Sequence, residues 1–259
     1  MKMLQVIINS RLVERIKRKS ALITGMHLKL KRLSPSASEN YRIVKILANY
    51  NLTKVLDIGA NAGQFAETLI DFGYKGEIIS FEPTSKAYIK LQKRARRHKK
   101  WSIADKMAIG NYNGNIDINV AENSLFSSVK NISKDYSEYN KSSQKSTSEN
   151  VPIKTLDSLE NIYFNKDENI FLKIDTQGFE KEVLEGAKES LKFIKAVKIE
   201  IPLVSIYNNV NWSLKEIVDF FAKLNFKCID ISEVAVNNKT GIVHEVDGVF
   251  IRKEYLNNY

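Results

Sequence analysis

The stretch "KVLDIGANAGQF", residues 54–65, decides the fold of this chain. It begins as an apolar strand, turns at a run of small residues and continues into the start of a helix. In open α/β sheets, ligands bind beyond the carboxyl ends of the strands, where glycines let the backbone approach them. The turn "DIGANAG" (57–63) is therefore a candidate binding element, and an acid, Asp57, stands directly before its glycines.

The rest of the chain alternates in the same way between helices and strands. Helices are expected over residues 39–50, 63–72, 84–98, 178–192 and 213–223. Strands are expected at "KVLDIG", "GEIISFEP", residues 101–109, "NIFLKIDT", "AVKIEIP", "FKCIDI" and "GVFIRK", with a hairpin around "GNYNGNIDINVAE" (110–122). This alternation predicts the α/β class, with a mostly parallel seven-stranded sheet and helices on both faces. The last two strands have no helix between them, which predicts an antiparallel edge strand.

Length and composition indicate one large domain with an extension. Of the 259 residues, 43% are hydrophobic, which is enough for a substantial core. The formal net charge of +10 favours anionic partners. The single cysteine, Cys228, excludes an internal disulfide. The polar segment "LSPSAS" (33–38) marks the boundary between a basic helical extension at residues 1–38 and the main domain at 39–259.

Two segments carry much of the positive charge. In the extension, Leu4, Ile8, Leu12 and Ile16 recur at helical spacing among basic residues, which predicts an amphipathic basic helix. This helix would lie on an anionic membrane surface, or pack on its own domain or on a second copy of the chain in a homo-oligomer. The segment "KAYIKLQKRARRHKK" (86–100) contains no acid, and it is either a solvated helix face or a surface for an acidic acceptor.

No uncharged segment reaches the roughly 20 residues that a membrane-spanning helix needs, and the apolar run before Arg11 is too short for a signal peptide. We therefore expect a cytoplasmic protein, peripheral to the membrane at most. The polar tract at residues 130–150 has no glycine, proline or periodicity. Its length makes it a candidate lid over the ligand or a linker.

The residues around the glycine turn discriminate between ligands. The turn does not match the G-x-x-x-x-G-K-[ST] phosphate loop, which excludes the common nucleotide hydrolases. A carboxylate at Asp57 would repel the pyrophosphate of a dinucleotide, whereas the ammonium and sulfonium of S-adenosylmethionine would be attracted, directly or through water. Glu82 follows the next strand, about 20 residues beyond the glycines, at the spacing of an acid that accepts both hydroxyls of an adenosyl ribose. The less favoured alternative is that Glu82 is only a helix-start acid before Pro83.

Two further acids end later strands of the predicted sheet. Asp175 in "LKIDTQGFE" would emerge beside the first strand, at the ligand edge, where it would also suit the N-cap of the next helix. Glu200 in "KIEIP" lies at the same edge, and it is a candidate base, a hydroxyl-binding residue or simple surface. Glu180, in a first helical turn, is favoured there by the helix dipole alone.

Taken together, these segments resemble the FkbM-type methyltransferases, which are S-adenosylmethionine-dependent enzymes with a Rossmann-like class I fold. The resemblance covers roughly residues 53–230 and rests on several motifs in the same order. These motifs are "VLDIGANAGQF", "FEP", "NSLFSSV" (123–129), "VPIKTLDSL", "LKIDTQGFEKEVLEGA" (172–187) and "EIPLVSIY" (200–207). The family implies O-methylation of a hydroxyl on a sugar, a glycan or a related small molecule.

The resemblance also implies roles for individual residues. The cofactor would contact the turn and the two strand ends through Asp57, Gly59, Asn61, Gly63, Gln64, Phe65, Glu82, Pro83 and Asp175, and its adenine would lie near Asp105 and Ala108. Ser127 and Glu200 would contact the acceptor. For the base that removes the acceptor proton, our hypothesis names Asp175 first and Glu200 second. Gln177 stands where many members have an acid, so a metal-assisted mechanism is left open.

Three other functions compete with this interpretation. An RNA methyltransferase would explain the net charge, but "DTQG" is not the D/N-P-P-Y/F pattern of base-amino methyltransferases, and the basic segment carries only Tyr88 for stacking. A non-enzymatic scaffold with a nucleotide fold would not bind S-adenosylmethionine. A nicotinamide dehydrogenase is disfavoured by the charge of Asp57.

Overall fold

The computed structural model describes residues 34–121, 129, 146–204 and 212–256 of the chain. Ser127 and residues 130–145 of the polar tract lie outside the described residues. The chain divides into two compact units, Met1–Glu39 and Asn40–Tyr259, and the fold below is that of the second unit. No helix in the described part combines the length and apolar character needed to cross a lipid bilayer.

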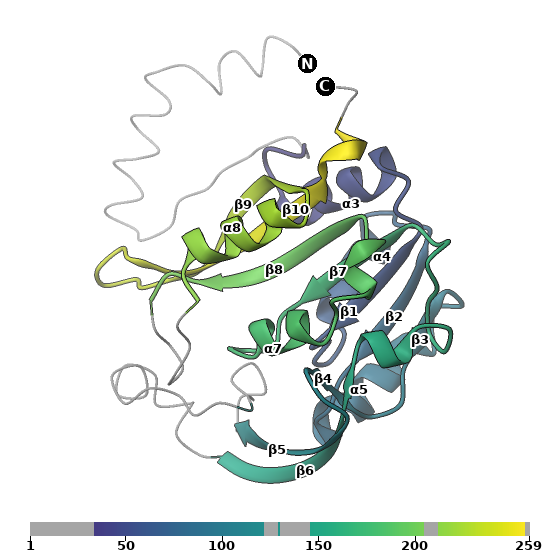
Figure 1. Cartoon of the computed structure of the whole chain (residues 1–259). Coiled ribbons are helices and arrows are strands. Elements are labelled where there is room, and N and C mark those ends of the chain that lie inside the picture. Colours follow the sequence, from purple (N-terminus) through teal and green to yellow (C-terminus); the bar gives the residue numbers. More distant parts are fainter. Residues whose placement is uncertain (1–33, 122–128, 130–145, 205–211, 257–259) are drawn as a thin grey trace, which may run out of the picture. The chain divides into compact units, whose positions relative to one another are not determined.

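A seven-stranded sheet forms the centre of this unit, in the order β3-β2-β1-β7-β8-β10-β9 (Figure 1). Strands β3, β2, β1, β7 and β8 run parallel to one another, and β10 runs antiparallel to both β8 and β9. The mostly parallel α/β fold expected from the sequence is confirmed, with the antiparallel strand one position in from the edge. The strands are β1 (Lys54–Ile58), β2 (Glu77–Phe81), β3 (Trp101–Ile103), β7 (Ile170–Ile174), β8 (Ala196–Pro202), β9 (Phe226–Val236) and β10 (Val243–Arg252).

Helices cover both faces of the sheet. One face packs against α3 (Glu39–Asn49), α4 (Gln64–Asp71) and α5 (Ser85–Ala95). The other face packs against α7 (Glu180–Glu185) and α8 (Leu214–Lys223). Helix α7 is shorter than the expected helix over 178–192, because the chain leaves the helix at Gly186 and returns only as the short 3₁₀ helix η4 (Ser190–Lys192). Two further 3₁₀ helices are η3 (Asp157–Leu159) and η5 (Lys253–Tyr255).

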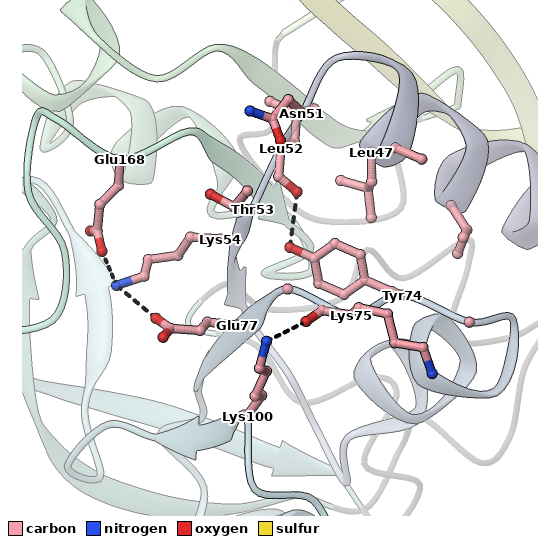
Figure 2. A pocket seen from close by; sticks show the side chains of 14 residues that line it. Leu47, Asn51, Leu52, Thr53, Lys54, Tyr74, Lys75, Glu77, Lys100 and Glu168 are labelled. Carbon is pink, nitrogen blue, oxygen red and sulfur yellow. Dashed lines mark hydrogen bonds and ion pairs between the residues drawn. The ribbon is translucent and has the colours of Figure 1, made fainter.

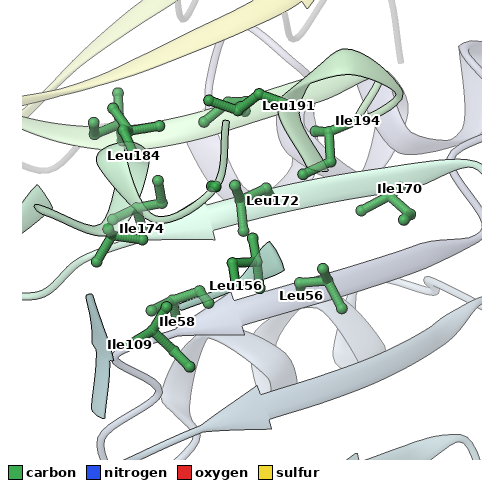
Figure 3. Packing of buried hydrophobic residues seen from close by; sticks show 14 of the residues in the cluster. Leu56, Ile58, Ile109, Leu156, Ile170, Leu172, Ile174, Leu184, Leu191 and Ile194 are labelled. Atoms are coloured by element: carbon green, nitrogen blue, oxygen red, sulfur yellow. The ribbon is translucent and has the colours of Figure 1, made fainter. Parts of the chain in front are cut away.

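Strand alternation divides the core into two layers. Leu56 and Ile58 of β1 point to the α7 side, where they join aliphatic side chains of β7 and the segments beside it (Figure 3). Val55 points to the opposite side, toward α3, α4 and α5. Each fully buried side chain of this size contributes roughly 1.5–3 kcal/mol of transfer free energy. Asp57 therefore also points toward the layer of α3, α4 and α5, because it follows Val55 by two residues.

A second, three-stranded sheet has the order β4-β6-β5 and consists of β4 (Ala108–Gly110), β5 (Gly114–Ala121) and β6 (Ser146–Thr155). The expected hairpin at 110–122 is therefore wrong, because β4 and β5 do not pair with each other and both pair with β6. The local turn sequence is outweighed by burial, since Ile118 packs against Val151 and Ile153 of β6. Residues 146–150 of the polar tract belong to β6.

Candidate functional site

The strand register gathers charged side chains at the carboxyl edge of the main sheet. Asp57 on β1 lies opposite Ser80 on β2 and Lys173 on β7, and Lys173 lies opposite Lys198 on β8. On the antiparallel strand, Asp247 lies opposite Glu200. We call this group, which occupies the ends of four strands, the carboxyl-edge cluster: Asp57, Lys173, Asp175, Lys198, Glu200, Glu245 and Asp247.

Asp57 does not lie at an open turn mouth. The whole of Asp57 is buried, with an exposed fraction of 0%. Its carboxylate accepts a hydrogen bond from Ser80 Oγ at 3.0 Å and pairs with Lys173 Nζ at 3.1 Å. The direct contact to a cationic ligand is therefore wrong, because Asp57 is buried and neutralised from inside the protein, whereas the contact through water stays a prediction. For the same reason, the charge of Asp57 alone does not repel a pyrophosphate.

Lys173 connects two acids of the cluster. Its ammonium lies 3.1 Å from Asp57 and 3.2 Å from the Asp175 carboxylate, and it also donates to the Gly59 carbonyl at 3.3 Å. Burial alone would lower the pKa of Lys173, but Asp175 and Asp57 outweigh it and raise the pKa above its ordinary value. Lys173 is therefore a permanent cation at the base of the site.

The glycine turn needs its glycines for two separate reasons. Gly59 has a φ of +76°, and a Cβ there would lie 1.8 Å from the Asp175 carbonyl oxygen. Gly63 has a φ of +89°, and a Cβ there would lie 2.6 Å from the Trp101 ring. Asn61 also adopts a left-handed conformation, with a φ of 50°. The turn is thus pressed against the end of β7 on one side and against β3 on the other.

Four of the five amides of residues 59–63 are used within the protein. Gly59 and Ala60 donate to the Phe81 carbonyl at 3.1 and 3.0 Å, and Gly63 donates to the Ala60 carbonyl at 2.8 Å. The Asn61 amide donates to Glu82 Oε2 at 2.9 Å. A dinucleotide pyrophosphate requires free amides at such a turn. The four occupied amides therefore disfavour a dinucleotide at this turn independently of the charge of Asp57.

Glu82 joins the turn after β1 to the segment after β2. Its Oε1 accepts from the amide and the hydroxyl of Thr84, while Oε2 accepts from Asn61. A carboxylate offers about four acceptor positions, so the contacts among the described residues leave one, on Oε2. Burial raises the pKa of Glu82 despite these hydrogen bonds. In this conformation Glu82 could accept one ribose hydroxyl, not both as the spacing predicted.

Asp175 and Glu200 are brought together by a residue between them. The Gln177 amide nitrogen donates to Asp175 Oδ1 at 2.9 Å and to Glu200 Oε2 at 2.8 Å. Gln177 adopts a left-handed backbone conformation, with a φ of 55°, that turns its side chain toward both acids. Within the described residues no hydrogen-bond donor reaches Glu200 Oε1. One oxygen of Glu200 is thus held and the other remains able to accept a proton.

The two acids have opposite electrostatic environments. Burial raises the pKa of Asp175, but Lys173 outweighs this and the net pKa lies below its ordinary value, with the side chain 36% exposed. Burial, and after it the charges of Asp175 and Glu245, raise the pKa of Glu200 well above its ordinary value. Burial and then Asp175 raise the pKa of Glu245 to about 7. Glu245 therefore gains or loses its proton near neutral pH, and the proton affinity of Glu200 is raised in the same direction.

Glu245 should make the protein less stable above neutral pH. Its residue is 9% exposed, and its folded-state pKa of about 7 exceeds the ordinary 4.5. The folded chain holds a proton that the unfolded chain releases in this range, so stability present below pH 4.5 is lost as the pH rises to 7. We expect Glu245→Gln to raise the melting temperature at about pH 8 by roughly 2–4 °C, and much less at about pH 5.

Thermal melts at both pH values test this expectation. The matched control is Glu233→Gln, an exposed acid on the neighbouring strand β9 that should change neither melt. Equal melting of Glu245→Gln and the parent at both pH values would mean that Glu245 titrates as an ordinary surface acid.

The remaining predicted cofactor residues lie in different surroundings. Phe65 lies under the two lysines, with its ring centre 5.5 Å from Lys173 Nζ and 5.8 Å from Lys198 Nζ. Gln64 is exposed, and Pro83, which directly follows Glu82 in the sequence, is half-buried. Asp105 is exposed, and its amide donates to the Tyr163 hydroxyl at 3.0 Å. These positions stay predictions.

Ala108 does not suit an adenine contact. It is buried in β4 and packs with Ile118, Val151 and Phe179 under the small sheet. The expected strand over 101–109 instead ends at Ile103, and the chain between β3 and β4 carries Asp105 outward. The prediction for Ala108 is corrected for this reason. Glu180 is also structural, since its carboxylate accepts from the Thr176 amide at 2.9 Å.

Several residues of the cluster were missed by the sequence analysis. Lys173 and Lys198 each interrupt a buried strand two residues before an acid, in "LKID" and "VKIE". A buried lysine requires an anionic partner, so this repeated spacing was a usable signal. Glu245 and Asp247 gave no such signal, because their position depends on the pairing of β10 with β8. Tyr163 likewise meets Asp105 only through the tertiary fold.

A separate pocket of about 510 Å³ lies at the opposite, amino edge of the sheet (Figure 2). Several polar side chains that line this pocket form ion pairs or hydrogen bonds within the protein. Lys54 forms ion pairs with Glu77 and Glu168, and the Tyr74 hydroxyl donates to the Leu52 carbonyl at 3.1 Å. None of the predicted cofactor or acceptor residues lines this pocket. We therefore assign the candidate site to the carboxyl edge.

The acid-rich carboxyl edge fits S-adenosylmethionine better than a phosphate-bearing ligand. Asp175 is partly exposed and its pKa is lowered, so it offers an ionised carboxylate to a ligand with an ammonium and a sulfonium. Among the described residues, no group of His, Cys, Asp and Glu side chains has an arrangement suited to a metal ion.

A search of curated proteins found no match. Solved structures with a similar fold include the methyltransferase domain of bacterial CtHen1-C, with 12% identity, a TM-score of 0.44, and coverage of 85% of this chain and 99% of that one. A SAM-dependent methyltransferase from Aquifex aeolicus has 13% identity, a TM-score of 0.41 and coverage of 85% and 99%. Precorrin-6y C5,15-methyltransferase from Geobacter metallireducens has 10% identity, a TM-score of 0.42 and coverage of 82% and 87%.

The family comparison is decisive. The model of the methyltransferase FkbM domain matches residues 57–228, from the buried acid of β1 into β9, which is well over half of the chain. The match contains the glycine turn, Glu82, Gln177 and both acids that Gln177 joins. The chain has a Rossmann-like α/β fold and belongs to the FkbM methyltransferase domain family.

Proposed function

We propose that this protein transfers a methyl group from S-adenosylmethionine to a hydroxyl of a sugar, a glycan or a related small molecule. The observation that carries the proposal is Glu200, a buried acid with a raised pKa and one free oxygen at the carboxyl edge. An alcohol is a poor nucleophile until its proton is being removed, and a base whose pKa lies near the working pH removes it best.

Different residues of the chain would bind the cofactor and align the acceptor. When bound, S-adenosylmethionine supplies a methyl group that its sulfonium activates for in-line displacement. The turn at 59–63 and Glu82 would hold the cofactor, and the acids of the cluster would face its positive charges. Alignment of the acceptor oxygen at such a site can supply several kcal/mol of the barrier reduction.

Electrostatics favour Glu200 over Asp175 as the base. The ion pair with Lys173 keeps Asp175 ionised but lowers its pKa, which weakens its affinity for a proton. Glu200 has no cation within ion-pair distance among the described residues, and its pKa is raised. We therefore assign proton removal to Glu200 Oε1 and assign to Asp175 the positioning of Gln177 and the contact with the cationic part of the cofactor.

An RNA acceptor is less well supported. Asp175 is partly exposed and ionised at the carboxyl edge, and a phosphate backbone would be repelled there. The predicted contact of Ser127 with the acceptor stays a proposal, as does a lid in the polar tract, although residues 146–150 of the predicted 130–150 are part of β6 and not of a loop.

Calorimetric titration with S-adenosylmethionine and S-adenosylhomocysteine tests the cofactor. We expect both to bind, and Glu82→Ala to weaken binding by about 10- to 100-fold, because it removes a charge-assisted acceptor. The matched control is Glu77→Ala, an exposed acid at the other end of the same strand, which should bind like the parent. Absence of binding by the folded parent would support the non-enzymatic scaffold instead.

A methyl-transfer screen tests the acceptor class. Free sugars, glycosides, glycan fragments, small phenols and single-stranded RNA are offered with radiolabelled cofactor. Transfer to sugar hydroxyls supports the proposal, and transfer to RNA alone overturns it.

A further inference from the structure

Helix α5 presents two contrasting faces. Ala87, Leu91 and Ala95 are buried against the sheet. The outer side of the helix and the turn that follows it carry a run of exposed cations. We call this group the α5 basic surface: Lys86, Lys90, Lys93, Arg96, Arg97 and Lys99.

The cations of the α5 basic surface are not paired with acids within the described part of the chain. Of the cations in this segment, Arg94 pairs with Glu67 at 3.1 Å. The six side chains of the surface form no ion pair with any described residue. Their spacing increases the repulsion, because Lys86 and Lys90, and likewise Lys93 and Arg97, are four residues apart. Such repulsion is relieved when an anionic partner binds.

An apolar side chain lies among these cations. Ile89 is 53% exposed and is three residues from Lys86 and four from Lys93, so it shares their side of the helix. A cationic surface with a protruding aliphatic residue suits a lipid surface, which offers anionic headgroups above hydrocarbon. Single-stranded nucleic acid is bound instead by exposed aromatic rings. The one aromatic residue of the helix, Tyr88, is half-buried and its hydroxyl donates to the Ala104 carbonyl at 2.9 Å.

We propose that the α5 basic surface binds the surface of a membrane that contains acidic phospholipids, with Ile89 entering the headgroup boundary. The partner is distinct from anything that the carboxyl edge would bind, because that edge is acidic and α5 is basic. Helix α5 begins three residues after Glu82, so one end of the surface adjoins the carboxyl edge. A membrane bound there would lie near the site. The inference does not depend on methyl transfer.

Vesicle co-sedimentation of the full-length chain tests the inference. Vesicles of phosphatidylglycerol and phosphatidylcholine in equal parts are compared with vesicles of phosphatidylcholine alone, at physiological ionic strength. We expect the parent to bind the acidic vesicles and K90E/K93E/R97E to bind them about tenfold more weakly or worse, since each basic residue near an anionic surface contributes to partitioning. I89S should also weaken binding.

The control variant carries the same charge change elsewhere. Lys188, Lys223 and Lys239 are exposed and outside α5, and K188E/K223E/K239E should retain most of the binding. Unchanged melting temperatures and cofactor titrations show that both triple variants are folded. Binding by K90E/K93E/R97E equal to the parent's, or an equal loss in the control variant, overturns the proposal. So does a result in which the α5 variant loses binding to single-stranded RNA but not to acidic vesicles.

Discussion

Glu200→Gln is expected to lower the turnover number by about 10²- to 10⁴-fold, the usual contribution of a general base. The substitution removes the proton acceptor but keeps an oxygen to which the Gln177 amide can donate, as it now does at 2.8 Å. The affinity for S-adenosylmethionine and the melting temperature should therefore change little. The measurement is steady-state kinetics with the acceptor found by the screen, beside calorimetric titration of the cofactor.

The pH profile separates a base from a merely structural acid. Burial and the charges of Asp175 and Glu245 raise the pKa of Glu200, so a rate that needs ionised Glu200 should rise with pH well above the range of an ordinary glutamate. Glu245→Gln removes one of these charges and should move this rise to lower pH. Because the acids interact, the midpoint belongs to the cluster and not to one residue.

Asp175→Asn discriminates between the two candidate bases. If Glu200 is the base, Asp175→Asn keeps a pH-dependent rate, reduced by altered positioning of Gln177. If Asp175→Asn lowers the turnover number at least about 10²-fold while the turnover number of Glu200→Gln stays within about threefold of the parent, Asp175 is the base and the assignment is reversed. Turnover of both variants within that small factor would exclude either acid as the base.

The fold was predictable because each buried strand has a recognisable pattern within its own short stretch of sequence. Buried parallel strands form short apolar runs between helical patterns, and "KVLDIG" and "NIFLKIDT" both have that form. The glycine turn could be predicted as well, because Gly59 and Gly63 adopt conformations that other residues avoid. The hairpin at 110–122 failed because a local turn signal cannot reveal that β6, from much later in the sequence, pairs with both strands.

The candidate site was predicted by residue type but not by arrangement. Strand ends at one edge identified Asp57, Asp175 and Glu200 as neighbours. The sequence could not show that Lys173 neutralises Asp57, because the side of a strand is fixed by a register that pairs residues more than 100 positions apart. Nor could it show that Gln177 spans two acids, since this depends on a left-handed backbone at that position.

Lys173→Met is expected to destabilise the fold by about 3–5 kcal/mol, the usual result of removing one partner from a buried ion pair. Asp57 is completely buried, and after the substitution its carboxylate would keep only the Ser80 hydroxyl as a donor among the described residues. Asp175 is partly exposed and could be solvated. Most of the loss should therefore arise from Asp57. Urea denaturation measures it, provided that the slope of the transition is unchanged.

The double variant tests this account. Asp57→Asn with Lys173→Met removes both charges and leaves a neutral group that can still accept from Ser80, so it should regain a large part of the lost stability. The matched control is Lys192→Met, whose lysine and its partner Glu189 are 68% and 65% exposed in an ion pair of 2.6 Å. Surface pairs contribute about 0–1 kcal/mol, so this variant should unfold like the parent. Additive losses in the double variant would show that Lys173 supports the sheet by packing and not by neutralising Asp57.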